Sequence, residues 1–190
     1  MLIDLTLKLT KKMLYDAMVI KNEALVGHAG THFDVMDKDF PLTYTERPGI
    51  VFDVRDVTGR EIDCTDVDLN AVQKDMFVAF CSGYDEAVAY GEPGYFSDHP
   101  QLSYGLIHAL LEKGISIIGL DFAGIRRTPE HIPADQCCAD RGVFVIENLR
   151  NLKDVLAHGG RFTAFTYPIR CSDLTGLPCR VVARVEEASL

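Results

Sequence analysis

Short apolar runs predict a chain made mainly of β-strands. The runs are rich in β-branched and other apolar residues, as strands are. FVAFC, residues 77–81, is apolar throughout, which indicates a strand buried on both faces. The other predicted strands are LIDLTLKL, EALVG and IVFDVRDV near the start, and RFTAFTYPIR and CRVVARVEE near the end. TGLP, residues 175–178, separates the last two and is typical of a turn.

One segment has the pattern of an amphipathic helix. In PQLSYGLIHALLEKG, residues 100–114, apolar residues recur at helical spacing and Gly114 is suited to end the helix. The apolar stripe consists of Leu106, Ile107, Leu110 and Leu111. ISIIGLD, residues 115–121, follows at once as a buried strand, so helix, turn and strand form the second half of a βαβ crossover.

The same order recurs later in the chain. GVFVIENL is a predicted strand that carries Glu147 at its end, and NLKDVLAHGG is a short helical stretch. His131 and Asp135 precede this strand in a segment interpreted as a loop. The pattern therefore predicts an α/β fold with much sheet and few helices.

Length and composition place the chain among ordinary globular proteins. The 190 residues fit a single domain, 1–190, and the longest apolar runs are too short to cross a bilayer. The net charge of -9 argues against nucleic acid or an anionic membrane as a partner, because both are bound by clustered Lys and Arg. No secretory signal is evident at the N-terminus, so we expect a cytoplasmic protein.

Six cysteines are present and none forms a C-x-x-C pair. In a cytoplasmic protein they are expected to be reduced. The neighbours Cys137 and Cys138 are interpreted as buried small hydrophobes, with a thiol-based site as the weaker alternative.

The stretch GHAGTHFDVMDK, residues 27–38, carries the strongest chemical signal. It places His28, His32 and Asp34 within seven residues, and imidazole nitrogen and carboxylate oxygen are ligands of Zn²⁺ and Mn²⁺. Gly30 disfavours a helix here. In an extended segment His32 and Asp34 share one face, and His28 would reach them across a bend. The alternative is a set of solvated polar residues on a loop.

Other candidates are weaker when taken alone. Asp121 and Glu147 end predicted strands, where sites in α/β sheets commonly form. Asp121 could equally cap the next helix. His131 could be a ligand or a solvated loop residue.

At this point the sequence resembles the cyclase family of metal-dependent hydrolases, which includes bacterial kynurenine formamidase and isatin hydrolase. HAGTHFDVMDK is similar to the family signature H-x-G-T-H-x-D-x-P-x-H, and departs from it at Met36 and Lys38. Further similar segments are LIDLT, FCSGYDE, YFSDHPQLSYGLIHALLEKGISIIGLD and GVFVIENLRNL. The resemblance implies a single compact layered β/β/α domain, commonly assembled as a homodimer or homotetramer.

The resemblance also implies roles for the matching residues. His28, His32 and Asp34 would hold a first divalent ion, Zn or Mn, and Asp34 could bridge to a second. Glu147 matches a ligand of that second ion, whose usual His is replaced by Asp135. His131, four residues earlier, could substitute. One or two ions per chain are compatible with this set.

Lys38 stands where the family usually has a His. The resemblance implies that this His would serve as general base or as an electrostatic partner to the attacking water. A charged Lys cannot accept a proton at pH 7, although it could stabilise an oxyanion as a donor. Lys38 and Glu147 are therefore the predicted catalytic residues, with Asp34 or Glu147 handling protons. The predicted function is hydrolysis of the C–N bond of a small amide, formamide or lactam. The alternative is a weak or inactive relative that binds a small molecule or partner.

Overall fold

The computed structural model describes residues 1–13, 15, 27–171 and 173–186. Its strands are β1 (Leu2–Asp4), β2 (His32–Asp34), β3 (Glu46–Asp53), β4 (Phe77–Cys81), β5 (Ile117–Leu120), β6 (Phe144–Glu147), β7 (Arg161–Pro168) and β8 (Gly176–Arg184). Its α-helices are α3 (Tyr84–Ala87), α4 (Tyr104–Lys113), α5 (His131–Asp140) and α6 (Leu152–Leu156). Short 3-10 turns occupy Leu42–Tyr44, Cys64–Asp66 and Leu69–Ala71.

The sheet closes on itself. Its order is β1-β8-β2-β6-β5-β4-β3-β7, and β8 also pairs with β7, so the strands from β2 to β8 form a closed seven-stranded barrel. The neighbours β3, β4, β5 and β6 are parallel, whereas β2, β7 and β8 join antiparallel. Because parallel strands end at the same edge, Cys81, Leu120 and Glu147 are brought to one end of the barrel.

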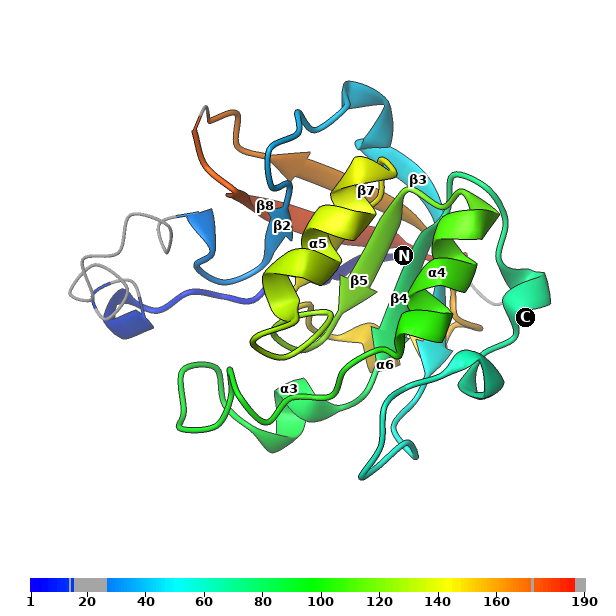
Figure 1. Cartoon of the computed structure of the whole chain (residues 1–190), viewed down its shortest axis with the longest axis horizontal. Helices are drawn as coiled ribbons and strands as arrows, with labels where there is room; N and C mark the ends of the chain where they lie inside the picture. The colour runs from blue at the N-terminus through cyan, green and yellow to red at the C-terminus, as the bar shows by residue number, and fades with distance from the viewer. Residues whose placement is uncertain (14, 16–26, 172, 187–190) are drawn as a thin grey trace.

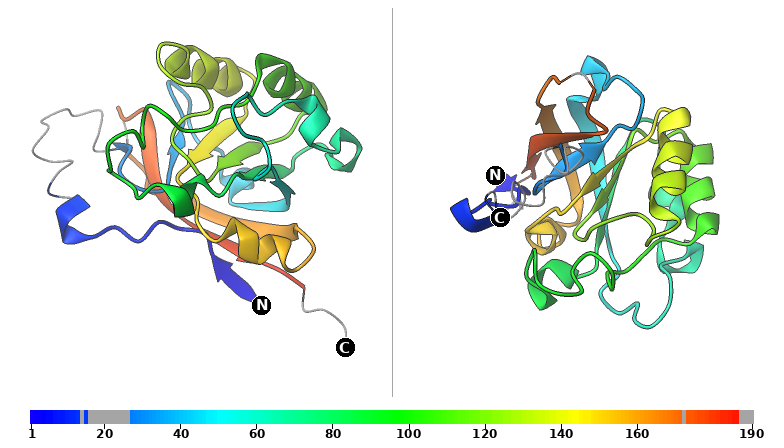
Figure 2. Two further views of the ribbon diagram at one scale, coloured as in Figure 1. Left: turned by 90° about the horizontal axis from the view of Figure 1, so that it is seen from below. Right: turned by 60° about the vertical axis from the view of Figure 1, so that its left-hand side comes forward.

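Alternation along the strands divides the core into two. In β4, Phe77 and Ala79 face one cluster, which also contains side chains from β2, β7 and β8. Val78 and Phe80 face the other cluster, which contains the apolar stripe of α4 and Cys138 of α5. Figure 1 and the right view of Figure 2 show α4 and α5 together on one side of the sheet. A strand buried on both faces therefore needs the uninterrupted apolar run seen in FVAFC.

The predicted helix is confirmed. Ser103 is its N-cap and accepts a hydrogen bond from the backbone N–H of Leu106, while Gly114 ends it in the left-handed region at φ 68°. The helix joins β4 to the parallel strand β5, which completes the predicted βαβ crossover. Overall the mixed α/β class is confirmed, and no helix in the described residues is long and apolar enough to span a membrane.

Several predicted strand boundaries were wrong. The strand within LIDLTLKL is only Leu2–Asp4, and β3 starts four residues before IVFDVRDV and ends at Asp53. TGLP is not a turn from Gly176 on, because Gly176–Pro178 pairs with β2 and begins β8. Residues 23–26 of EALVG lie outside the described residues.

The largest correction is α5. The segment predicted as a loop is a ten-residue helix that begins at His131 and contains Asp135. The helix HIPADQCCAD shows no long apolar stripe, because its buried side chains are mostly small or polar: Ala134, Asp135, Cys138 and Ala139. Four residues apart on a helix, His131 and Asp135 face the same side.

Alanine substitutions at two glycines are expected to change the stability of the protein in opposite directions. A methyl group at Gly119 in β5 would lie 2.3 Å from Phe77 Cε2 and 2.7 Å from Leu149 Cδ1, whereas one at exposed Gly105 in α4 meets only ordinary contacts. Gly119→Ala is expected to lower the free energy of unfolding by about 1–3 kcal/mol through overpacking. Gly105→Ala is expected to raise it by about 0.5–1 kcal/mol through helix propensity. Urea unfolding measures both, and equal effects would contradict the packing described.

Candidate metal centre

Six side chains from β2, its preceding loop, α5 and β6 converge at one end of the barrel. In the first group, His28 Nδ1 lies 3.0 Å from His32 Nε2 and 3.0 Å from Asp34 Oδ1. His32 Nε2 lies 3.5 Å from the same carboxylate oxygen. The predicted arrangement of this group is confirmed: His32 and Asp34 share one face of β2, and His28 reaches them across the bend at Gly30.

The second group joins α5 to β6. His131 Nε2 lies 3.0 Å from Asp135 Oδ2 and 3.0 Å from Glu147 Oε1. The other oxygen of Glu147, Oε2, lies 3.6 Å from His32 Nε2, so Glu147 connects the two groups. Asp34, His131 and Asp135 also bring ligand atoms within 4.8 Å of one another. Both residues considered for a second metal position, His131 and Asp135, therefore lie in this cluster.

Within the part of the chain that the structure describes, two carboxylate oxygens of this cluster have no hydrogen-bond partner. They are Asp34 Oδ2 and Asp135 Oδ1, each on a side chain that is 2% or 3% exposed. A buried carboxylate oxygen without a partner is costly unless a proton or a cation compensates it. The donor types and these two oxygens fit a divalent ion, because Zn²⁺ and Mn²⁺ take imidazole nitrogen and carboxylate oxygen.

Mutual charge shifts the titration of the cluster. Burial alone would lower the pKa of His32, but the carboxylates of Asp34 and Glu147 outweigh it and raise that pKa to about 9. The pKa of Asp135 is also raised, to about 8, because burial and the neighbouring Asp34 carboxylate disfavour its charged form. Burial opposes a charged His131 too, yet Asp135 and Glu147 raise its pKa to about 11. Without an ion, protons on His32, His131 and Asp135 reduce the charge of the cluster at neutral pH.

Backbone groups fix how the histidines point. His32 Nδ1 lies 2.9 Å from the carbonyl oxygen of Gly30, so Nδ1 carries the hydrogen and Nε2 faces the cluster. His28 is turned the other way, with Nε2 3.0 Å from the hydroxyl of Thr175 and Nδ1 toward the cluster. Asn148 donates to the carbonyl oxygen of Gly30 at 2.9 Å and so holds that loop in place.

Thr175 and Asn148 were not predicted as site residues. Asn148 directly follows Glu147 in the ENL segment, and this position could have indicated that it lies at the site. Thr175 lies 147 positions from His28 and precedes β8, so only the closed sheet brings the two together.

The remaining candidates lie elsewhere. Asp121 accepts hydrogen bonds from the backbone N–H groups of Ser82 and Gly83 and from the Ser82 hydroxyl, which makes it a cap for the turn after β4. Cys138 is buried in the core, where burial raises the pKa of its thiol, and Cys137 packs against the same cluster. A buried protonated thiol is a poor nucleophile, so this pair is best explained by packing.

Lys38 is placed at the opposite end of α5 from His131. Its ammonium lies 2.8 Å from Asp140 Oδ1 and 3.0 Å from Asp37 Oδ1, and its side chain is 36% exposed. Asp140 is nine residues after His131, which corresponds to about 13 Å along a helix. These contacts give no support to the predicted catalytic role of Lys38.

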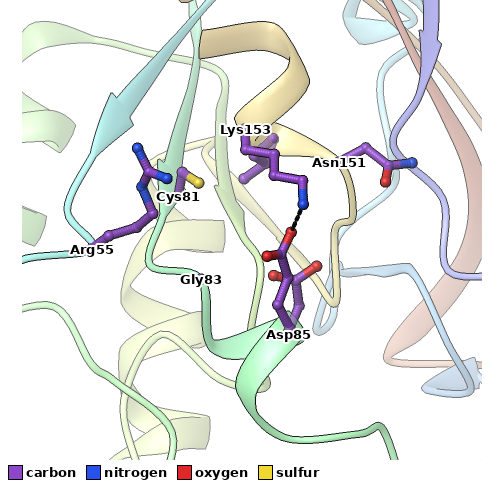
Figure 3. A pocket seen from close by; sticks show the side chains of 8 residues that line it. Arg55, Cys81, Gly83, Asp85, Asn151 and Lys153 are labelled. Carbon is purple, nitrogen blue, oxygen red and sulfur yellow. Dashed lines mark ion pairs between the residues drawn. The ribbon is translucent and has the colours of Figure 1, made fainter. Parts of the chain in front are cut away.

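Two surface cavities lie apart from the six donors. A crevice of about 20 Å³ has room for about one water molecule. It is lined by Arg55, Cys81, Lys153 and neighbouring residues (Figure 3). Burial raises the pKa of the Cys81 thiol there to about 12, so the thiol is not activated. A wider cleft of about 510 Å³ is lined by Arg55, Arg60, Arg127 and others, and most of its basic groups are already paired.

Comparison with known proteins settles the family. The Cyclase family model matches residues 3–126, more than half of the chain. The chain belongs to the cyclase family. No curated protein gave a sequence match.

Solved structures of cyclase-type proteins share the fold. A "potential metal-dependent hydrolase with cyclase activity" is 25% identical, with TM-score 0.78 and 98% of both chains covered. A "predicted metal-dependent hydrolase" from Bacillus stearothermophilus is 24% identical, with TM-score 0.75 and coverage of 96% of this chain and 97% of that one. Isatin hydrolase A from Labrenzia aggregata is 17% identical, with TM-score 0.75 and coverage of 98% and 94%.

The contact between Thr175 and His28 generates a test of this cyclase-family centre. Thr175→Val removes the hydroxyl that orients His28 Nε2 while keeping the side chain's shape. Because partners of this kind fix a ligand's tautomer and direction, Zn²⁺ affinity is expected to fall about 10–100-fold. Isothermal titration calorimetry measures the affinity. Thr163→Val on β7 is the matched control, and a loss of affinity as large in the control would contradict the assignment.

Proposed function

We propose that this cyclase-family protein is a metal-dependent hydrolase that opens the C–N bond of a small amide, formamide or lactam. The observation that carries the proposal is the convergence of six ligand-type side chains around the unpartnered oxygens of Asp34 and Asp135. The solved structures described as metal-dependent hydrolases, with similar fold and nearly complete coverage, support it.

The residues that would hold the metal are those of the cluster. His28 Nδ1, His32 Nε2 and Asp34 form one set, and His131 Nε2, Asp135 and Glu147 form another beside it. When bound there, a divalent ion polarises a carbonyl group and lowers the pKa of water toward 7.

Exposure indicates where a substrate would approach. The side chains of His28 and His131 are 25% and 33% exposed, whereas those of His32, Asp34, Asp135 and Glu147 are 5% exposed or less. The open side of the cluster therefore runs between the two partly exposed histidines. A small amide would lie there, and bulk water would not reach it from the buried side of the cluster.

Proton transfer falls to a carboxylate in this proposal. Glu147 contacts His131 through Oε1 and His32 through Oε2, so it lies centrally between the two sets. We assign the acceptor role to Glu147 on the basis of this central position. Lys38 has no part in this transfer.

The pKa shifts predict how metal binding depends on pH. A protonated imidazole cannot ligate, and the pKa of His32 is raised to about 9 by its carboxylate neighbours. Metal binding must therefore displace protons, and affinity is expected to fall steadily as the pH is lowered from about 9 to about 6. Calorimetric titrations with Zn²⁺ in buffers of different ionisation enthalpy measure the released protons. Affinity that does not change over this range would contradict a histidine-ligated site.

Metal content and hydrolysis together test the function. The purified chain is expected to hold at least about one Zn²⁺ or Mn²⁺ per molecule and to hydrolyse a member of a panel of N-formyl amines and cyclic amides. Loss of activity on chelation, and its recovery on adding the metal, would support hydrolysis. Stable metal binding without turnover of any panel member would favour the alternative, a binding protein built on the same scaffold. Absence of bound metal would overturn both the site and the activity.

Two substitutions separate the predicted catalytic residues. Lys38→Met is expected to leave kcat/KM within about twofold and to have little effect on stability, because its ion pairs are exposed. Glu147→Ala is expected to remove activity and weaken metal binding, because it removes both contacts to the histidines. Steady-state kinetics and metal analysis measure the two effects. A large loss of activity in Lys38→Met would restore the catalytic role given to it by the sequence.

A further inference from the structure

The two halves of the cluster differ in chemistry. The first half offers two imidazole nitrogens and the Asp34 carboxylate. The second half offers a single imidazole, that of His131, with the carboxylates of Asp135 and Glu147 and access to Asp34. One half is therefore rich in nitrogen and the other rich in oxygen.

Each half also contains a buried carboxylate oxygen that a cation would compensate. Among the described residues, Asp34 Oδ2 and Asp135 Oδ1 have no hydrogen-bond partner. Asp34 belongs to both groups of three ligand atoms that lie within 4.8 Å of one another, one with His28 and His32 and the other with His131 and Asp135. The cluster therefore offers two adjoining donor sets, one for each of two ions.

Ligand hardness then distinguishes the ions. Imidazole suits Zn²⁺, whereas carboxylate oxygen suits harder ions such as Mn²⁺ and Mg²⁺. Zn²⁺ binds more tightly than Mn²⁺ at most sites, so what differs between the halves is the size of that preference. The preference for Zn²⁺ is smaller in the oxygen-rich half than in the nitrogen-rich half.

We propose that the two halves hold different ions, with Zn²⁺ on His28, His32 and Asp34 and Mn²⁺ on His131, Asp135 and Glu147. This inference rests on the proposed function for the existence of the centre, and goes beyond it in assigning unequal sites. Asp135 is the residue that decides the difference, because it supplies the additional carboxylate of the oxygen-rich half.

Metal competition tests the proposal without an activity assay. The full chain is stripped with a chelator and dialysed against Zn²⁺ with about a hundredfold excess of Mn²⁺, since Zn²⁺ binds more tightly in general. Mass-spectrometric metal analysis is expected to give about one Zn²⁺ and one Mn²⁺ per chain, with an electron paramagnetic resonance spectrum of isolated Mn²⁺. Two ions of the same element per chain would overturn the unequal sites and leave the proposed function standing. No bound metal would overturn both.

Variants locate the Mn²⁺. Asp135→His makes the second half richer in nitrogen, and it is expected to replace the Mn²⁺ by a second Zn²⁺ under the same dialysis. Asp135→Asn, which is closer in shape, is expected to lose Mn²⁺ and keep Zn²⁺. Asp140→His at the far end of α5 is the matched control and is expected to keep one of each. Circular dichroism confirms that each variant is folded. Retention of Mn²⁺ by both Asp135 variants would overturn the assignment.

Discussion

The pairing of β2 with β6 and β8 is the constraint on which the centre depends. β2 has three residues, and its register sets His32 opposite Glu147 on one side and opposite Pro178 on the other. The middle residue, Phe33, is fully buried in the core cluster that fills one side of the sheet. Since side chains alternate, burying Phe33 forces His32 and Asp34 onto the opposite face. A slip of one residue would put the phenyl ring where the ligands belong, so packing enforces the register.

Closure of the barrel makes this short strand sufficient. An isolated three-residue strand would be weak, but β2 is bonded on both edges within a ring of strands. The same closure brings Thr175, just before β8, against His28. The cluster gathers three carboxylates and three histidines in a mostly buried space, and such groups repel or desolvate one another unless charge is balanced. The surrounding strands hold them together whether protons or metal ions supply that balance.

Sequence patterns predicted the parts of the fold whose burial follows a simple period. The predictions for FVAFC and for α4 were correct. FVAFC packs apolar side chains against both core clusters, and α4 packs its apolar stripe against one of them. α5 was missed because its buried side chains are small or polar, so its packing leaves no apolar stripe. The start of β8 was missed because Gly and Pro in TGLP favour turns locally, whereas tertiary pairing with β2 decides the outcome.

The candidate site was predictable to the extent that its residues lie close in sequence. His28, His32 and Asp34 share one segment, and their mutual geometry follows from extended backbone. The second set depends on α5, and without that helix the sequence left His131 and Asp135 as alternatives. On a helix they are one turn apart, so both reach the same position, where the family has one His. In the proposed centre, both side chains would therefore be available as ligands.

The position of Lys38 follows from Met36. The family signature has Pro at this position, and a proline ring holds φ near −65°. Here Met36 has φ 55°, a left-handed conformation that no proline could adopt, and the backbone N–H of Lys38 bonds to the carbonyl oxygen of Val35 in a turn. After this turn, the Lys38 ammonium pairs with the neighbouring Asp37 and with Asp140 at the end of α5. The two departures from the signature are thus one structural change, because the backbone is redirected at Met36 and the side chain of Lys38 is paired away from the cluster. In the proposed hydrolysis, proton transfer would therefore depend on groups within the cluster.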